Sequence, residues 1–259
     1  MHAHIIQLDI VWENKEANFA KVKQLIQSAP INPNDLIVLP ELFDVGFTLN
    51  AEIATDAPGT TRAFLQQLTD DTRCTIHGSR AIPDPDTGKL HNVATITAPN
   101  QASPICEYAK LHPFSFGRET ESYTAGNEIT SYQWVSNQTL HICPVICYDL
   151  RFPELFRHAI HQGAQAFVLG ANWPDARIAH WRALCIARAI ENQAFVIAAN
   201  RTGDDPHLSY LGNSIVISPM GEVLGELSNE ETILSVEINP QSVIDWRSTF
   251  PVLNDIKLI

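Results

Sequence analysis

The sequence lacks the features expected of a membrane-spanning or nucleic-acid-binding protein. Only 17 of its 259 residues are Lys or Arg, against 29 Asp or Glu, which gives a net charge of -12. Nucleic acids and anionic membranes favour basic surfaces, so we expect neither as a partner. No apolar run is long enough to cross a bilayer. The N-terminus also has no basic region followed by an apolar stretch and a small-residue cleavage site, so we expect no export signal.

Cysteine is scarce, and several catalytic motifs are missing. The five cysteines are odd in number, which argues against a disulfide framework in a chain of this length. A reducing cytoplasm is therefore the expected compartment. The ten histidines form no HExxH motif and no paired His–Cys spacing for zinc. There is also no GxSxG elbow and no GxxxxGK[ST] phosphate loop. These absences exclude the common zinc, serine-elbow and P-loop signatures.

What the sequence does contain is an alternation of strand and helix patterns. In the first predicted helix, Phe19, Val22, Leu25 and Ile26 recur at helical spacing. Helices are predicted at 14–29, 60–71, 153–162 and 176–192. Strands are predicted at 2–10, 35–40, 74–82, 91–98, 104–110, 139–147, 165–171, 194–200, 213–219, 222–227 and 232–238. No linker, low-complexity segment or clear sequence repeat interrupts this pattern.

The composition of the strands indicates the type of sheet. Runs such as LIVL, AFVL and FVIAA are apolar on both alternating faces, which is typical of strands covered on both sides. Strands in the middle of the chain alternate polar and apolar residues, which favours antiparallel pairing. We therefore predict one layered α/β domain with mixed sheets over residues 1–259. Pro144 lies inside a predicted strand, where its missing N–H requires a bulge or an edge position.

Three predicted strands end in chemically reactive side chains. Glu41 follows the strand DLIVLP, Lys110 follows PICEYA, and Cys147 follows LHICPVI. Ligands of open α/β sheets bind beyond the carboxyl ends of strands, so these three groups can converge on one pocket. Taken singly, each has an ordinary reading: a cap after a proline, a solvated lysine and a small core residue. The sequence alone leaves those readings open.

The combination of residue types favours chemistry over these readings. A thiol is only slightly ionised at neutral pH, and a carboxylate within reach can take its proton. A nearby lysine favours the thiolate and can stabilise the oxyanion that forms when sulfur attacks a carbonyl. The sequence therefore predicts Cys147 as a nucleophile, Glu41 as its base and Lys110 as a cationic stabiliser. Cys143, on the same strand and deeper in it, is predicted to be core.

Several sequence blocks together resemble a known family. They are LPELF at 39–43, KLHPF at 110–114, ICYDLRFPEL at 146–155, ANWP at 171–174, ARAIENQAFV at 187–196 and GNSIVISPMGEVL at 212–224. In this order they are similar to the carbon–nitrogen hydrolase, or nitrilase, superfamily, and most similar to its omega-amidase branch. The resemblance implies a four-layer α-β-β-α sandwich with two mixed sheets, and a homodimer that forms through its helical faces. It implies no metal and no organic cofactor.

The resemblance also assigns roles to residues of this chain. It implies a catalytic Glu–Lys–Cys triad of Glu41, Lys110 and Cys147. A second glutamate of the family lies seven residues before a glycine, which selects Glu119, before Gly126, over its neighbour Glu121. A second oxyanion donor would be the backbone N–H of the residue after the cysteine. Further residues expected at the site are Tyr148, through that N–H, and Phe114, Trp173, Arg177 and Arg151 for substrate binding.

The implied activity is hydrolysis of a small-molecule ω-amide of a dicarboxylic acid, such as 2-oxoglutaramate, through a cysteine thioester. The carboxylate of such a substrate needs a cationic partner. Arg177, after ANWP, is one candidate, and Arg151, after the nucleophile, is another, with a structural ion-pair role as an equally weighted alternative for Arg151. The alternatives within enzymes are an N-carbamoyl amino acid amidohydrolase and a nitrile hydrolase, which would use the same triad. A catalytically silent family member that acts through its dimer surface is the alternative outside enzymes.

Overall fold

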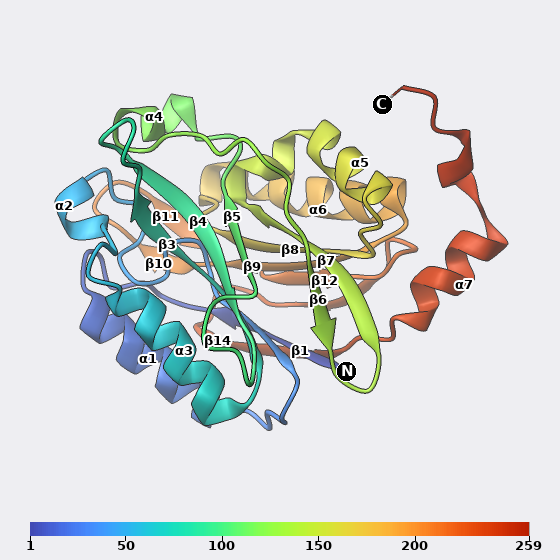
Figure 1. The fold of residues 1–259 in the computed structure, drawn as a ribbon, viewed down its shortest axis with the longest axis horizontal. Helices are drawn as coiled ribbons and strands as arrows, with labels where there is room; N and C mark the ends of the chain where they lie inside the picture. The colour runs from blue at the N-terminus through green and yellow to red at the C-terminus, as the bar shows by residue number, and fades with distance from the viewer. Residues whose placement is uncertain (259) are drawn as a thin grey trace.

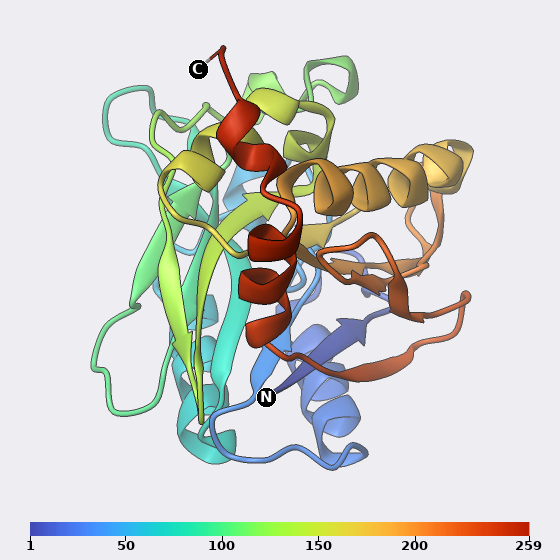
Figure 2. The same cartoon turned by 90° about the vertical axis from the view of Figure 1, so that its right-hand side faces the viewer.

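The computed structural model describes residues 1–258, which fold into four layers (Figures 1 and 2). Two six-stranded sheets pack face to face, and two helices cover the outer side of each. The predicted α-β-β-α sandwich with two mixed sheets is therefore confirmed. The covering helices are α1 (Lys15–Gln27) and α3 (Thr60–Thr72) on the first sheet, and α5 (Pro153–His161) and α6 (Ile178–Asn192) on the second.

The two sheets share one pattern of strand directions. In each, three parallel strands are extended by one antiparallel pairing on one side and by two successive antiparallel pairings on the other. The first sheet runs in the order β14 (Thr232–Glu237), β1 (His2–Gln7), β2 (Leu36–Val38), β3 (Thr75–Pro83), β4 (Leu90–Thr97), β5 (Cys106–Ala109). The second runs β6 (Tyr132–Val135), β7 (Thr139–Ile146), β8 (Ala166–Ala171), β9 (Phe195–Asn200), β12 (Ile215–Ile217), β13 (Val223–Glu226).

Shorter elements complete the chain. A hairpin of β10 (Thr202–Asp204) and β11 (Ser209–Leu211) stands apart from both sheets. The remaining helices are α2 (Ala51–Ala54), α4 (Glu119–Ser122) and α7 (Gln241–Thr249), with 3-10 turns at Ser115–Gly117, Cys147–Arg151, Asp175–Arg177 and Val252–Asp255. All four predicted helices lie within two residues of their observed ends. No strand was predicted at β6, β10 or β11, which are short and partly exposed.

Local sequence explains where the covering helices begin and what they bury. Asn14 caps α1 by accepting a hydrogen bond of 3.0 Å from the Ala17 N–H. Val22 is among the α1 side chains buried against the first sheet. Phe19 of α1 stacks on Phe64 of α3, with 4.0 Å between ring centroids, and so joins the two helices.

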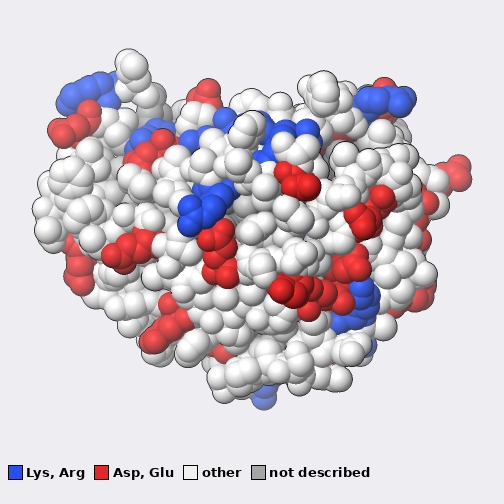
Figure 3. Space-filling view, turned by 180° about the vertical axis from the view of Figure 1, so that it is seen from behind, with Lys and Arg blue, Asp and Glu red and all other residues white. Residues whose placement is uncertain are grey.

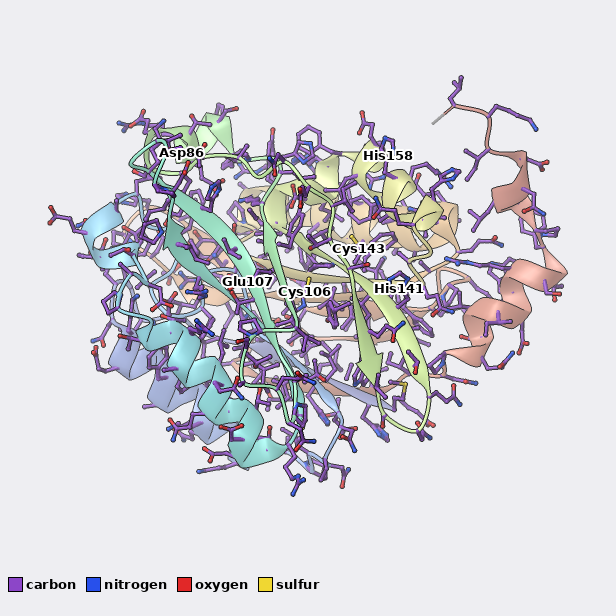
Figure 4. The ribbon with its side chains drawn as sticks, in the orientation of Figure 1. Asp86, Cys106, Glu107, His141, Cys143 and His158 are labelled. Carbon is purple, nitrogen blue, oxygen red and sulfur yellow. The ribbon has the colours of Figure 1, made fainter. Side chains whose placement is uncertain are left out.

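The largest apolar core lies between the two sheets and beneath α5 and α6. Figure 4 labels Cys106 on β5 and Cys143 on β7 within this interior, whereas Asp86 and His158 lie at its periphery. Cys143 is fully buried, and burial raises the pKa of its thiol, so it stays protonated. The prediction that Cys143 is a core residue is confirmed.

Pro144 sits in β7, which is not an edge strand of its sheet. Its register on β8 is regular, with Pro144 opposite Val168. The β6 ladder on the other side, however, ends at Ile142, opposite Tyr132. Pro144 therefore occupies a part of β7 that has a strand neighbour on one side only, where a missing N–H is tolerated.

The charge distribution agrees with the acidic composition. On the face shown in Figure 3, acidic side chains are spread widely and basic ones form smaller groups. No helix within residues 1–258 has the length and apolar character needed to span a membrane.

His77 of β3 is buried between the sheets, and the one hydrogen-bond partner of its imidazole within residues 1–258 is the Tyr132 hydroxyl, 3.2 Å from Nδ1. No described residue bonds to its Nε2. Burial lowers the pKa of His77 to about 3, so the imidazole is neutral in the folded protein near neutral pH.

Acid is therefore expected to destabilise the fold through His77. In the unfolded chain the His77 imidazole binds a proton with a pKa near 6.5, whereas in the folded chain that pKa is about 3. The stabilisation of the folded state that comes from neutral His77 is therefore complete above pH 6.5 and is lost as the pH falls towards 3. The full effect is on the order of 5 kcal/mol. Urea unfolding at pH 7 and pH 4.5 measures it, with His77→Gln as the non-titrating comparison. An identical loss of stability in that variant would contradict this assignment.

Candidate active site

Loops at the strand ends enclose a cavity of about 400 Å³. It contains Glu41, Lys110 and Cys147, the three residues that the sequence placed after strands β2, β5 and β7. The expected convergence of these side chains is thus what the structure shows. The other lining residues are Trp12, Glu13, Phe47, Thr48, Leu49, Phe114, Gly117, Asn172, Pro174, Arg177, Asp205, His207, Leu208 and Tyr210.

Glu41 is fully buried and held at both carboxylate oxygens. Its Oε1 accepts hydrogen bonds from Lys110 Nζ and from Asn92 Nδ2, each at 2.8 Å. Its Oε2 accepts from the Asn172 N–H at 3.0 Å. The Asn172 side chain also donates to the Glu41 backbone carbonyl at 2.6 Å. These bonds fix the orientation of the carboxylate without protonating it.

Lys110 lies between two carboxylates. Its ammonium donates to Glu41 and, at 2.9 and 3.1 Å, to the two oxygens of Glu119. Burial would lower the pKa of Lys110, but the negative charges of Glu119 and Glu41 outweigh it and hold that pKa well above its usual value. Lys110 therefore remains a cation and can donate hydrogen bonds to a developing oxyanion.

Cys147 occupies the first residue of the 3-10 turn after β7, with a left-handed φ of +42°. Such a φ is uncommon for a residue with a Cβ and needs support from its surroundings. Asp149 provides that support, because its buried carboxylate accepts hydrogen bonds from the Ile146 N–H at 3.0 Å, the Tyr108 hydroxyl at 2.8 Å and the His112 N–H at 3.0 Å. Asp149 thus ties the cysteine turn to the end of β5.

The electrostatics of the site set the resting protonation states. Burial alone would raise the pKa of Glu41, but the charge and hydrogen bond of Lys110, with the bonds from Asn172, bring it below its usual value. Burial and the Glu41 charge raise the pKa of Cys147 well above its usual value, although Lys110 opposes them. The resting site therefore holds an ionised carboxylate and a neutral thiol, which is the pairing needed for general-base activation of the nucleophile.

Glu119 lies behind Lys110 and does not line the cavity. Burial and the neighbouring Glu41 charge raise its pKa, although Lys110 opposes this. Its Oε2 also accepts the Phe114 N–H at 2.5 Å, so it connects Lys110 to the loop that bears Phe114. The segment from Lys110 to Gly126 is joined at its two ends, because the Gly126 N–H donates to the Lys110 carbonyl at 2.8 Å. A Cβ at Gly126 would overlap the Ala109 carbonyl, which explains the glycine.

The rival glutamate, Glu121, is exposed and pairs instead with Arg118 at 2.8 Å. The predicted backbone donor, the Tyr148 N–H, is in the first turn of the 3-10 helix, and no described residue accepts a hydrogen bond from it. It is thus available as a donor next to Cys147.

The residues predicted to bind substrate divide into two groups. Phe114 and Arg177 line the cavity, with the Arg177 guanidinium 5.4 Å from the Phe114 ring centroid. Trp173 does not line it: the ring is buried, and its Nε1 donates to the Arg177 carbonyl at 2.8 Å. Arg151 also lies outside the cavity, 4.7 Å from the Trp173 ring centroid and 3.3 Å from His180 Nδ1. The structure thus separates the two arginines that the sequence left as candidates.

Two residues that hold Glu41 were not identified from the sequence. Asn172 follows β8 directly, so the strand-end rule that selected Cys147 would also have found it. Asn92 lies inside β4, opposite the segment that carries Lys110, and gives no such signal. Gly170 belongs to the same arrangement, because a Cβ there would lie 2.8 Å from the Leu39 carbonyl and 3.0 Å from the Glu41 nitrogen. The glycine lets β8 approach the backbone that bears Glu41.

Within residues 1–258, no three His, Cys, Asp or Glu side chains are grouped so that they could hold a metal ion. The residues of the cavity themselves supply a thiol, a carboxylate base, an ammonium donor and a free N–H. This set can carry out nucleophilic attack on a carbonyl carbon followed by hydrolysis of the acyl intermediate.

Comparison with known proteins gives consistent results. Residues 3–248 match the carbon-nitrogen hydrolase family. An omega-amidase of Yersinia enterocolitica is 35% identical over 97% of this chain and 94% of its own length. A 2-oxoglutaramate amidase of Bacillus subtilis is 34% identical over 97% and 96%. A crystal structure of a CN-hydrolase superfamily protein from Xanthomonas campestris, with an arsenic adduct in its active site, superposes with a TM-score of 0.91 at 30% identity, over 100% and 98% of the two chains.

Proposed function

The chain belongs to the carbon-nitrogen hydrolase family, and on that basis we propose that its cavity hydrolyses the terminal amide of a small ω-amide of a dicarboxylic acid. The observation that carries this proposal is the buried set of Glu41, Lys110 and Cys147 in one cavity. The names of the Yersinia and Bacillus relatives support the ω-amide class, with 2-oxoglutaramate as the first compound to test.

The proposed mechanism uses the protonation states described above. Glu41 accepts the proton of the Cys147 thiol as sulfur attacks the amide carbonyl carbon. The Lys110 ammonium and the Tyr148 N–H stabilise the oxyanion of the tetrahedral intermediate. Glu41 then returns its proton to the leaving nitrogen, ammonia departs and a thioester remains. Glu41 next takes a proton from water, which attacks the thioester and releases the acid and the free thiol.

Arg177 is the proposed partner of the substrate carboxylate. It lines the cavity, and among residues 1–258 its guanidinium has no carboxylate partner. Arginine is well suited to this task because its planar guanidinium can bind a carboxylate through two parallel hydrogen bonds. Arg151 is engaged with Trp173 and His180 outside the cavity, so we assign it to fixing the turn after Cys147.

A panel of substrates tests the proposed reaction. Ammonia release is measured for a 2-oxo ω-amide, an N-carbamoyl amino acid and an aliphatic nitrile of similar length, with Cys147→Ala as the blank. We expect the ω-amide to give the highest kcat/KM. It carries a carboxylate for Arg177, which the aliphatic nitrile lacks, and its amide carbonyl is more electrophilic than the ureido carbonyl of the carbamoyl compound. A carbamoyl compound or a nitrile as the best substrate would reassign the reaction within the same triad.

Alkylation separates an active enzyme from a catalytically silent family member. All five cysteines are free thiols, and Cys147 is the one that lines the cavity. Rapid loss of one thiol, mapped to Cys147, supports an active site. Five thiols that react equally slowly would indicate a catalytically silent family member.

The free thiols also support the proposed cytoplasmic location.

We also propose that the chain forms a homodimer through its helical face. Ile190 of α6, Met220 and Phe250 are each about half exposed, at 52%, 54% and 53%. Gly221 packs directly against the Ile190 side chain, because a Cβ at Gly221 would lie 2.4 Å from it. Met220, the residue before Gly221, is therefore close to Ile190 on this surface. Analytical ultracentrifugation should give twice the chain mass of 28.8 kDa. Ile190→Glu should shift the protein towards the monomer, and a wild-type monomer would contradict the proposal.

A further inference from the structure

The charged groups of the cavity are not all used by the proposed reaction. Glu41 and Lys110 pair with each other and with Glu119. The Asp205 carboxylate is already hydrogen-bonded within the β10–β11 hairpin, because it accepts from the His207 N–H at 2.7 Å and from the Tyr210 hydroxyl at 2.6 Å. Of the carboxylates and fixed cations that line the cavity, Arg177 and Glu13 remain.

Glu13 lies on the loop between β1 and α1, next to Trp12 at the cavity wall. Its backbone N–H donates to the Val45 carbonyl at 2.9 Å, which fixes the loop. Its Oε1 accepts the Thr48 hydroxyl at 2.5 Å. No described residue donates to Oε2, and no described cation pairs with the carboxylate. Glu13 thus presents an anchored negative charge with one unused oxygen to the cavity.

Arg177 presents the opposite charge from a different element, the 3-10 turn between β8 and α6. The two residues do not form an ion pair with each other in the part of the chain that the structure describes. The cavity therefore keeps one free anion and one free cation on separate segments. A ligand that satisfies both must carry a negative and a positive group.

We propose that Glu13 is a specificity-determining residue that binds the ammonium group of an α-amino ω-amide while Arg177 binds its carboxylate. This inference rests on the proposed ω-amide hydrolysis and names the substrate feature that Glu13 recognises. An ammonium group donates to the free oxygen of Glu13, whereas a 2-oxo group is only an acceptor and gains nothing from a carboxylate. Glu13 thus extends the substrates of the site to zwitterionic ω-amides such as L-glutamine.

Glu13→Gln tests the proposal because glutamine keeps an oxygen for the Thr48 hydroxyl and removes only the charge. We expect kcat/KM for L-glutamine to fall by about 10- to 100-fold, while the value for 2-oxoglutaramate stays within a few-fold of wild type. Inhibition by the products gives a readout independent of turnover. The variant should bind L-glutamate more weakly and 2-oxoglutarate unchanged.

Thr48→Val is the matched control, because it breaks the Glu13–Thr48 bond and keeps the charge. If Glu13 only holds the loop through this bond, Thr48→Val will lower kcat/KM for both substrates by the same factor, whereas Glu13→Gln, which keeps the bond, will change neither. That pattern overturns the proposal. Unchanged L-glutamine kinetics and L-glutamate inhibition in Glu13→Gln would overturn it as well. A wild-type protein that hydrolyses neither amide would refute the proposed function itself, which is a separate result.

Discussion

Cys147→Ala is expected to reduce ammonia release from an ω-amide by on the order of 10⁶-fold, the scale of loss when the nucleophile of a covalent mechanism is removed. No other side chain in the cavity can form the proposed thioester, since the remaining four cysteines are buried away from it. The fold should persist, because the turn is held by Asp149 and the side chain of Cys147 is only partly buried. Thermal unfolding of the variant checks that point.

The matched control for this prediction is Cys143→Ala, on the same strand and four residues earlier. It also removes a thiol, but from the closed core, so we expect a loss of stability of about 1–2 kcal/mol and near-normal kcat. Comparable activity in wild type and Cys147→Ala would remove Cys147 from the mechanism.

Glu41→Gln is expected to lower kcat by about 10²- to 10⁴-fold, the usual contribution of a general base. Glutamine keeps the size of the side chain but cannot take the thiol proton. The pH dependence supplies a second signature. Wild-type activity should be nearly constant around neutral pH, because the pKa of Glu41 lies below its usual value and the carboxylate is already ionised. Activity left in Glu41→Gln should instead rise with pH, because the pKa of Cys147 is raised and the thiol must then ionise unaided.

Glu119→Gln is the comparison for Glu41→Gln. Glu119 also contacts Lys110, but it does not line the cavity and therefore cannot reach the substrate. We expect it to act as a positioning residue, with a smaller loss of kcat and without the rise in activity at high pH. An equal loss and the same pH profile in both variants would show that Glu41 is not the distinct base.

The mixed α/β sheets and the meeting of Glu41 with Cys147 were predictable because the ends of the strands can be recognised in this sequence, whereas the four-layer arrangement was implied by the family resemblance. The buried strands β2 and β8 and the second half of β7 are continuous apolar runs, and their ends define the rim on which Glu41, Cys147 and Asn172 lie. The covering helices were found for a similar reason, since their apolar residues recur at helical spacing. Such local patterns need no knowledge of which segments become neighbours.

The rest of the site depends on contacts between distant segments. Glu13 and the hairpin residue Tyr210 reach the same cavity from opposite ends of the chain, and neither lies in a periodic pattern that points there. Asn92 is a buried polar residue inside a strand, and the alternation of polar and apolar residues does not indicate that it contacts the site. Trp173 follows a strand end as Asn172 does, yet its ring turns into the protein and supports the Arg177 loop. Side-chain direction after a strand is set by tertiary packing.

The thioester on Cys147 is tested most directly by rapid acid quenching of the wild-type protein during its first turnover of an ω-amide, followed by intact-mass analysis and peptide mapping. The thioester mechanism predicts an adduct with the mass of the substrate minus ammonia on the peptide that contains Cys147, and no adduct in Cys147→Ala. Release of ammonia with no acyl group on Cys147 at any time in that turnover, or with the acyl group on another residue, would contradict it.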